Sequence, residues 1–188
     1  RQDHVANTMP APYYRFDGAD DFISVTGDAN LQLGIGDFSF VFLLKSDGTA
    51  GTEHRLLDYG TTDRVTIRFD SNNKIEIILM ESSTSRETQT STTFNSDGLW
   101  HMIACTIDRS SATGMKIYVD GVEQPYTKQE DITAIADSID NAGNFYLGIQ
   151  TNEASVPFAG EMSSVKLYNT ALSATEVKEL YSGASVPF

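Results

Sequence analysis

Three residues that could do chemistry lie close together in one short stretch of the chain. Trp100 is the only tryptophan, Cys105 is the only cysteine, and His101 is one of three histidines. On a helix, a histidine and a cysteine four positions apart share a face, where the imidazole could activate the thiol as a nucleophile. On a strand, which rises about 3.3 Å per residue, their Cα atoms would lie about 13 Å apart and could not act together. The element that carries these residues therefore decides their chemistry.

Acidic side chains could form a hydrolytic site. A retaining glycoside hydrolase needs two carboxyl groups about 5 Å apart. The pair of acidic residues that comes nearest to this requirement is Glu76 and Glu81. An offset of five places their side chains on opposite faces of a strand unless a bulge intervenes. The spacing therefore favours solvated charges over hydrolysis.

A second acidic pattern could bind a metal ion. The turn that contains Asp17, Gly18, Asp20 and Asp21 packs its carboxylates into a short segment. Carboxylate oxygens in such turns are ligands that Ca²⁺ prefers, and calcium is the candidate structural cofactor. The alternative is a turn whose aspartates accept hydrogen bonds from its own backbone amides.

A sugar-binding site would need aromatic rings beside polar or charged side chains. The ligand-binding candidates that fit this description are His54, Arg55, Tyr59, Arg64 and Tyr126. The polar loop over residues 46–54 is long enough to form one wall of such a site. The alternative is that the tyrosines are half-buried packing residues, as is common in β-sandwiches.

The charge balance narrows the choice of partners. The chain of 188 residues has 26 acidic against 13 basic residues, and its net charge is −13 at pH 7. Such a charge repels the phosphates of nucleic acids and anionic membrane surfaces. No apolar run approaches the ~20 residues of a membrane-spanning helix. We therefore expect no nucleic-acid partner and no membrane insertion.

Strands are the elements predicted to position these residues. Apolar residues recur at every second position over residues 38–44, 65–69 and 75–79, and Gly, Asn, Asp and Ser separate the runs. About ten short strands of this kind indicate an all-β fold of two antiparallel sheets packed face to face. The polar segment over residues 81–93 is typical of a solvated outer strand, or of a binding edge.

A hairpin is predicted around the stretch with the cysteine. Residues 100–108 and 115–119 alternate, and an Asp-Gly turn follows the second run. On such a strand His101 and Cys105 are too far apart to form a dyad. We expect Cys105 to be a small buried hydrophobic residue, unless His4 or His54 reaches it from elsewhere in the fold.

A helical period occurs once, over residues 174–181. Ser173 and Glu176 form a capping box at its start, and Gly183 is predicted to end it. We expect one domain over residues 13–183, with a lead-in segment over residues 1–12 and the start of a C-terminal extension over residues 184–188. The same pentapeptide, ASVPF, occurs at the end of the chain and once before, which suggests that more polypeptide follows.

Several motifs occur in the order of a known family. Residues 16–23 (FDGADDFI) come first, and residues 97–101 (DGLWH) then lead into a strand followed by residues 117–121 (IYVDG). Residues 145–148 (FYLG) and the closing run over residues 158–176, with FAGE and VKLYNTALS, complete the set. Together they resemble the laminin-G-like domains of the concanavalin A-like lectin and glucanase superfamily. The resemblance implies a jelly-roll sandwich of two curved sheets.

The resemblance also implies where calcium would bind. In similar proteins calcium often lies where the loop after the first strand meets the last long strand, which would add Glu161 to Asp17, Gly18, Asp20 and Asp21. Function is less constrained, because similar domains bind sugars, bind proteins, or cleave polysaccharides.

We interpret the chain as a non-catalytic recognition module that binds a glycan or cell-surface polysaccharide. Similar domains occur in secreted bacterial proteins and in bacteriophage tail and capsid appendages. We therefore expect an extracellular or virion-surface location, with neighbouring subunits or domains of a larger assembly as partners. Two alternatives stay open: a purely structural virion or cell-surface domain, and a polysaccharide-degrading hydrolase or lyase.

Overall fold

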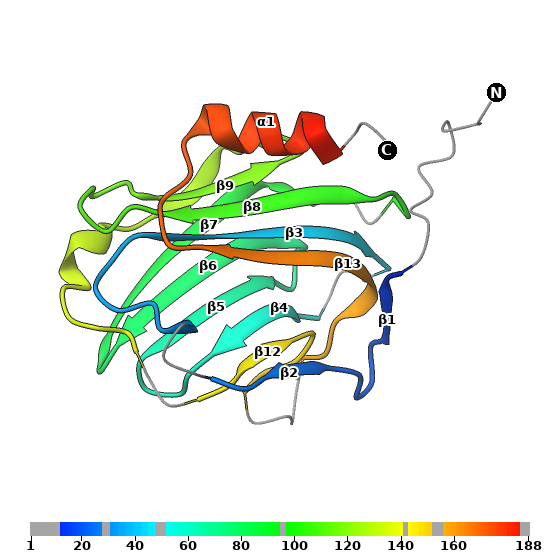
Figure 1. Cartoon of the computed structure of the whole chain (residues 1–188), viewed down its shortest axis with the longest axis horizontal. Helices are drawn as coiled ribbons and strands as arrows, with labels where there is room; N and C mark the ends of the chain where they lie inside the picture. Colours follow the sequence, from blue (N-terminus) through cyan, green and yellow to red (C-terminus); the bar gives the residue numbers. More distant parts are fainter. Residues whose placement is uncertain are drawn as a thin grey trace.

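Two antiparallel sheets pack face to face in the computed structural model of the chain (Figure 1). The structure describes residues 12–27, 31–47, 52–94, 97–140, 143–151 and 156–184. The six-stranded sheet contains, in spatial order, β1 (Tyr14–Asp17), β13 (Ala159–Tyr168), β3 (Phe38–Ser46), β8 (His101–Ile107), β9 (Met115–Val119) and β10 (Val122–Glu123). The seven-stranded sheet contains β11 (Tyr126–Gln129), β7 (Thr84–Thr93), β6 (Lys74–Glu81), β5 (Arg64–Phe69), β4 (His54–Tyr59), β12 (Phe145–Leu147) and β2 (Ile23–Val25). The predicted all-β sandwich is confirmed.

Alternation along the strands builds the core between the sheets. In β5, the side chains of Val65, Ile67 and Phe69 belong to the core and are at most 1% exposed. Because successive side chains of a strand point to opposite faces, Thr66 and Arg68 lie on the outer face of the same sheet. The period of two thus separates each sheet into an apolar inner face and an outer face.

The predicted turn between β5 and β6 is confirmed. The two strands pair antiparallel without a break in register. Asn73 has a φ of 56°, and Asp70 Oδ1 accepts hydrogen bonds from the backbone N–H groups of Asn72 and Lys74, both at 2.8 Å. Short polar side chains tolerate the left-handed region and bond to the nearby backbone, which closes this hairpin.

β7 differs from the expectation for its polar sequence. It lies inside the seven-stranded sheet, between β6 and β11, rather than at an edge. Its threonines Thr88 and Thr90 are at most 1% exposed. Local polarity could not predict this position, because β11 comes from a later segment that pairs with β7 only in the folded chain.

The helix α1 (Ala174–Ala184) covers part of the outer face of the six-stranded sheet (Figure 1). Val177 packs there with residues of β3, β8 and β9. The predicted capping box is present: Glu176 Oε2 accepts from the Ser173 N–H at 2.8 Å, and Ser173 Oγ accepts from the Glu176 N–H at 3.3 Å. The predicted stop at Gly183 is wrong by a short margin, since this glycine is helical. Among the described residues no helix is long and apolar enough to cross a membrane.

The hairpin of β8 and β9 carries Cys105 into the core. The cysteine is 0% exposed, and burial raises the pKa of its thiol far above the ordinary value. His54 does not reach it, because its ring nitrogens bond to the Pro157 carbonyl and the Thr52 hydroxyl. His4 lies outside the described residues, as do residues 48–51 of the predicted binding loop and residues 185–188 of the expected extension.

Candidate functional site

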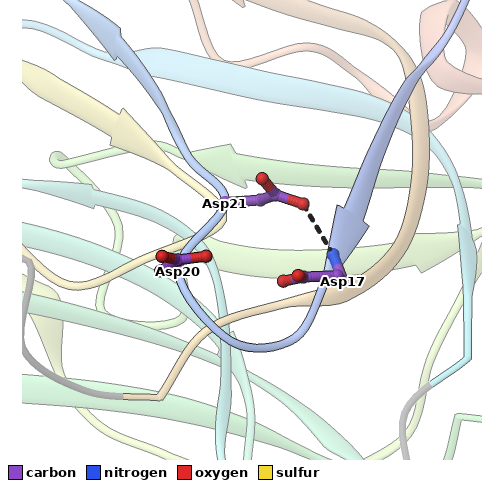
Figure 2. Close-up of side chains that lie close together, drawn as sticks. All are labelled: Asp17, Asp20 and Asp21. Carbon is purple, nitrogen blue, oxygen red and sulfur yellow. Dashed lines mark hydrogen bonds between the residues drawn. The ribbon is translucent and has the colours of Figure 1, made fainter.

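The acidic turn connects the two sheets. It follows β1 of the six-stranded sheet and leads into β2 of the seven-stranded sheet. Asp17, Asp20 and Asp21 are exposed, and each offers a carboxylate oxygen that lies within 4.8 Å of the others. Figure 2 shows the three side chains around the turn, with Asp21 directed toward the backbone of Asp17. Carboxylates at this spacing are suitable ligands for a hard cation.

The same aspartates also bond to the turn itself. Asp17 Oδ1 accepts from the Ala19 N–H at 2.8 Å, and Asp21 Oδ2 accepts from the Asp17 N–H at 3.0 Å. Gly18 has a φ of +78°, and a Cβ at this position would lie 2.9 Å from the Cβ of Ala159. The alternative, a turn whose aspartates cap its own backbone amides, therefore describes this geometry too. Calcium at the turn stays a prediction.

Glu161 lies outside this acidic group. Its carboxylate pairs with Lys45 Nζ at 2.7 Å, and this hydrogen bond raises the pKa of the lysine. The register between β1 and β13 explains the separation: Asp17 is opposite Ala159, whereas Glu161 is opposite Arg15. The structure thus brings together three of the predicted acidic ligands and places the fourth with a lysine.

The two tyrosines among the sugar-binding candidates are packing residues. Tyr59 is 1% exposed and stacks on Phe145 in the core with ring centroids 4.0 Å apart. Tyr126 packs partly buried against the core, and its hydroxyl accepts a hydrogen bond from the Ile117 N–H at 3.0 Å. Burial raises the pKa of Tyr126. Both tyrosines are therefore packing residues, as the alternative expects, and Tyr59 is fully rather than half buried.

His54 is also committed to the fold. It is 7% exposed, Nδ1 lies 2.9 Å from the Pro157 carbonyl oxygen, and Nε2 lies 3.1 Å from the Thr52 hydroxyl. Both ring nitrogens are therefore engaged at the start of β4. The histidine holds neighbouring backbone in place and offers a ligand no free nitrogen.

A different set of side chains forms a hydrogen-bonded row on the outer face of the seven-stranded sheet. We call it the polar row, and its members are Glu53, Arg68, Glu76, Gln89 and Thr127. Arg68 donates to Glu53 Oε2 at 2.6 Å and to Glu76 Oε2 at 2.5 Å. Gln89 Nε2 donates to Glu76 Oε1 at 3.3 Å, and Thr127 Oγ1 donates to Gln89 Oε1 at 2.9 Å. The row runs from the residue before β4 across β5, β6 and β7 to β11.

Strand register aligns the polar row. Arg68 is directly opposite Glu76, and Glu76 is directly opposite Gln89. Glu76 is 3% exposed, and burial raises the pKa of its carboxyl group while the charge of Arg68 opposes that rise. Sequence reasoning did not select the row as a site. The available signal was the polar residue at every second position of β5 and the pair Lys74 and Glu76 in β6, which shows a polar face but not which residues meet.

Arg55 and Arg64 lie on the same outer face as the polar row. Arg55 is opposite Arg68 in register and lies 3.5 Å from Glu53 through Nη1 and Oε2. Arg64 precedes Arg68 by four residues on β5, so strand alternation places it on the same face. The structure thus places two of the five predicted ligand-binding residues, both arginines, on this outer face, where Arg55 is 6% exposed.

Glu76 and Glu81 lie on opposite faces of β6, as their spacing predicts. β6 pairs with β5 without a break from Ile75 to Met80, so no bulge on that side turns Glu76 and Glu81 to one face. Glu76 is bonded to Arg68, and Glu81 Oε2 accepts from the Asp137 N–H at 2.9 Å. This pair does not have the facing arrangement of a glycosidase.

His101, the residue after Trp100, lies between two carboxylates, those of Asp97 and Asp120. Nδ1 of His101 lies 2.7 Å from Asp120 Oδ2, and Nε2 lies 3.2 Å from Asp97 Oδ1. The hydrogen bond with Asp120 raises the pKa of the imidazole. A cavity of about 170 Å³ adjoins the cluster and is also lined by Thr90 and Gln124. The histidine thus joins the two ends of the β8–β9 hairpin.

Comparison with known proteins identifies the family. The family model of the concanavalin A-like lectin/glucanases superfamily matches residues 17–178, which is most of the chain, and the chain belongs to this superfamily. Among curated proteins, no significant match exists.

Solved structures share the fold at low sequence identity. The binding domain of Paraclostridial Mosquitocidal Protein 1 superposes with a TM-score of 0.71 at 15% identity, over 90% of this chain and 43% of that one. The Ruminococcus gnavus IT-sialidase CBM40 bound to α2,3-sialyllactose gives 0.69 at 13% identity, over 91% of this chain and 97% of that one. The binding domain of botulinum neurotoxin serotype G gives 0.66 at 16% identity, over 92% and 46%. This chain therefore spans less than half of the two toxin chains.

Proposed function

We propose that the chain is a non-catalytic carbohydrate-binding module that holds a glycan on the outer face of its seven-stranded sheet. The observation that carries this proposal is the polar row, in which carboxylate, guanidinium and amide groups are fixed by hydrogen bonds across neighbouring strands. Sugar hydroxyls both donate and accept hydrogen bonds, so pre-positioned polar groups bind them at little cost in side-chain entropy.

The location of the row supports the same function. On the six-stranded sheet, α1 packs over residues of β3, β8 and β9, whereas the polar row lies on the opposite side of the sandwich. Tyr146 of β12 is half-buried and lies opposite Asp58, which places its ring at one flank of this face. Its ring centroid lies 6.0 Å from that of Phe22, whose side chain is 39% exposed. Aromatic side chains with exposed edges beside polar groups are common in sugar sites.

The structural relatives agree with this proposal. One of them is a sialidase module in complex with sialyllactose, and two are binding domains of toxins. Because the chain covers less than half of the toxin chains, we further propose that it acts as one module of a larger secreted or virion-surface assembly.

Calcium is a second, structural proposal. We propose that Ca²⁺ is held by Asp17, Asp20 and Asp21 and stiffens the crossover from β1 to β2. The convergence of the three carboxylates supports it, and the two hydrogen bonds that they accept leave further carboxylate oxygens for an ion.

The experiment for glycan binding is an array of neutral and acidic glycans probed with the chain, followed by calorimetry of the best ligand. We expect specific binding, and Gln89→Ala should weaken it about five- to tenfold because two hydrogen bonds of the row are lost. The matched control is Lys166→Ala, an exposed position on β13 of the other sheet, which should bind as the wild type does. Binding to no glycan would contradict the proposal and favour a purely structural domain.

The enzyme alternative has its own test at Glu76. Incubation with soluble polysaccharides should release no new reducing ends or unsaturated products. If cleavage is observed, and if Glu76→Gln abolishes it, the non-catalytic assignment is wrong.

A further inference from the structure

Three arginines concentrate positive charge on the outer face of the seven-stranded sheet. Arg55 of β4 is directly opposite Arg68 of β5, and Arg64 lies four residues before Arg68 on the same strand. Like charges directly opposite each other in a sheet destabilise it. The acidic side chains near these arginines are Glu53, Glu76 and Asp58.

The acidic neighbours compensate Arg68 better than Arg55. Arg68 bonds to Glu76 at 2.5 Å and to Glu53 at 2.6 Å, whereas Arg55 has only a 3.5 Å approach to the same Glu53 oxygen. Arg55 is 6% exposed, and its Nε has no hydrogen-bond partner among the described residues. A buried guanidinium with an unpaired donor is costly in free energy.

Arg64 is a partly buried arginine that also has an unpaired donor. Its Nε is buried without a hydrogen-bond partner, and no ion pair joins it to a described acidic residue. Burial, the largest cause, and the charges of Arg68 and Arg64 lower the pKa of Arg55, whereas the charges of Asp58 and Glu53 raise it. The nearby carboxylate of Asp58 accepts hydrogen bonds from Thr66 and Thr151.

We propose that the glycan bound on this face is acidic, and that its carboxylate docks at Arg55 and Arg64. A planar carboxylate matches the two donors of a guanidinium, and the pairing would supply the negative charge that Glu53 divides between Arg55 and Arg68. This inference rests on the proposed glycan-binding function, and it adds the class of sugar, one that bears a carboxylate such as a uronic or sialic acid.

Matched pairs of glycans test the proposal. The probes are α2,3-sialyllactose against lactose, and oligogalacturonate against its carboxyl-reduced form. We expect the wild type to bind at least one carboxylated probe about tenfold or more tightly than its neutral partner, and this preference should shrink as NaCl is raised. Binding of neutral glycans alone would overturn this inference and leave the proposed function intact, whereas binding of no glycan would overturn both.

Two variants, one that removes a positive charge and one that removes a negative charge, distinguish an effect on glycan recognition from an effect on folding. Arg64→Gln should lose about tenfold in affinity for the carboxylated probe and keep its affinity for the neutral one. Glu53→Gln should bind the carboxylated probe more tightly, because it removes the competing anion. Arg15→Gln, at an exposed arginine on β1, is the matched control and should bind as the wild type does. Equal affinity of the wild type and Arg64→Gln, or weaker binding by Glu53→Gln, would contradict the proposal.

Discussion

At the scale of single residues, His101 shows how tertiary contacts assign a role to a chemically versatile side chain. Its neighbour in the suspected dyad, Cys105, is buried in the core. The imidazole instead pairs with Asp120 and Asp97, which flank the β8–β9 hairpin. It also packs edge-on against the ring of Phe94, with ring centroids 5.1 Å apart. His101 therefore links Asp97, before β8, to Asp120, the residue after β9, through charged hydrogen bonds, and its role is structural.

This pairing predicts a pH-dependent contribution to stability. Asp120 raises the pKa of His101 in the folded chain above the ~6.5 of an unfolded histidine. The contribution is therefore complete below about pH 6.5 and is lost as the pH rises through the folded pKa. Melting curves from pH 5.5 to 8.5 should show that the wild type is more stable than His101→Gln at the acidic end and that the difference narrows toward alkaline pH. Each ~1 kcal/mol of difference in unfolding free energy corresponds to about 2–4 °C in melting temperature. Parallel curves for the two proteins would contradict this role.

At the scale of elements, β13 depends on one glycine. β13 lies between β1 and β3 and pairs with both. Gly160 has a φ of +145°, and a Cβ there would lie 2.2 Å from the carbonyl oxygen of Lys45 and 2.9 Å from the ring of Phe158. The close approach of β13 to β3 is thus possible only without a side chain at this position.

Gly160→Ala should therefore destabilise the fold by about 2 kcal/mol or more, through backbone strain and a clash with backbone that cannot move away. Chemical unfolding monitored by tryptophan fluorescence would measure the change. Gly183→Ala is the matched control, because nothing lies within 4 Å of its added Cβ and the residue is helical. It should be neutral or slightly stabilising. A similar effect of both substitutions would refute the steric explanation.

At the scale of the whole molecule, the acidic turn is the covalent link from one sheet to the other at the beginning of the sandwich. An ion held by Asp17, Asp20 and Asp21 would neutralise charge on an acidic protein and restrain this crossover. Calcium at about 100 times its dissociation constant stabilises a protein by ~2.7 kcal/mol, which corresponds to a rise in melting temperature of about 5–10 °C for a domain of this size.

Scanning calorimetry in calcium and in EDTA would measure this rise. The double variant Asp20→Asn and Asp21→Asn should lose the response to calcium, whereas Glu179→Gln, at an exposed position on α1, should retain it. An unchanged melting temperature of the wild type after chelation would reject the calcium proposal.

Much of the fold is predictable from local patterns in the sequence. Alternation at Val65, Ile67 and Phe69 assigns inner and outer faces, and the capping box at Ser173 marks the start of α1. These signals are readable because they depend on neighbours within a few residues. The stop of α1 was misplaced, because Gly183 suits a helix end but does not enforce one.

The candidate site was decided by the tertiary structure. The sequence by itself determined the family, the all-β class, the acidic turn and the presence of arginines in β4 and β5. It could not show that Glu161 pairs with Lys45, that Tyr59 stacks in the core, or that Glu53 and Thr127 lie at the two ends of one row. Alternation specifies the face that a side chain points to, whereas its neighbour across the sheet depends on the order and register of strands distant in sequence, which only the packed sandwich sets.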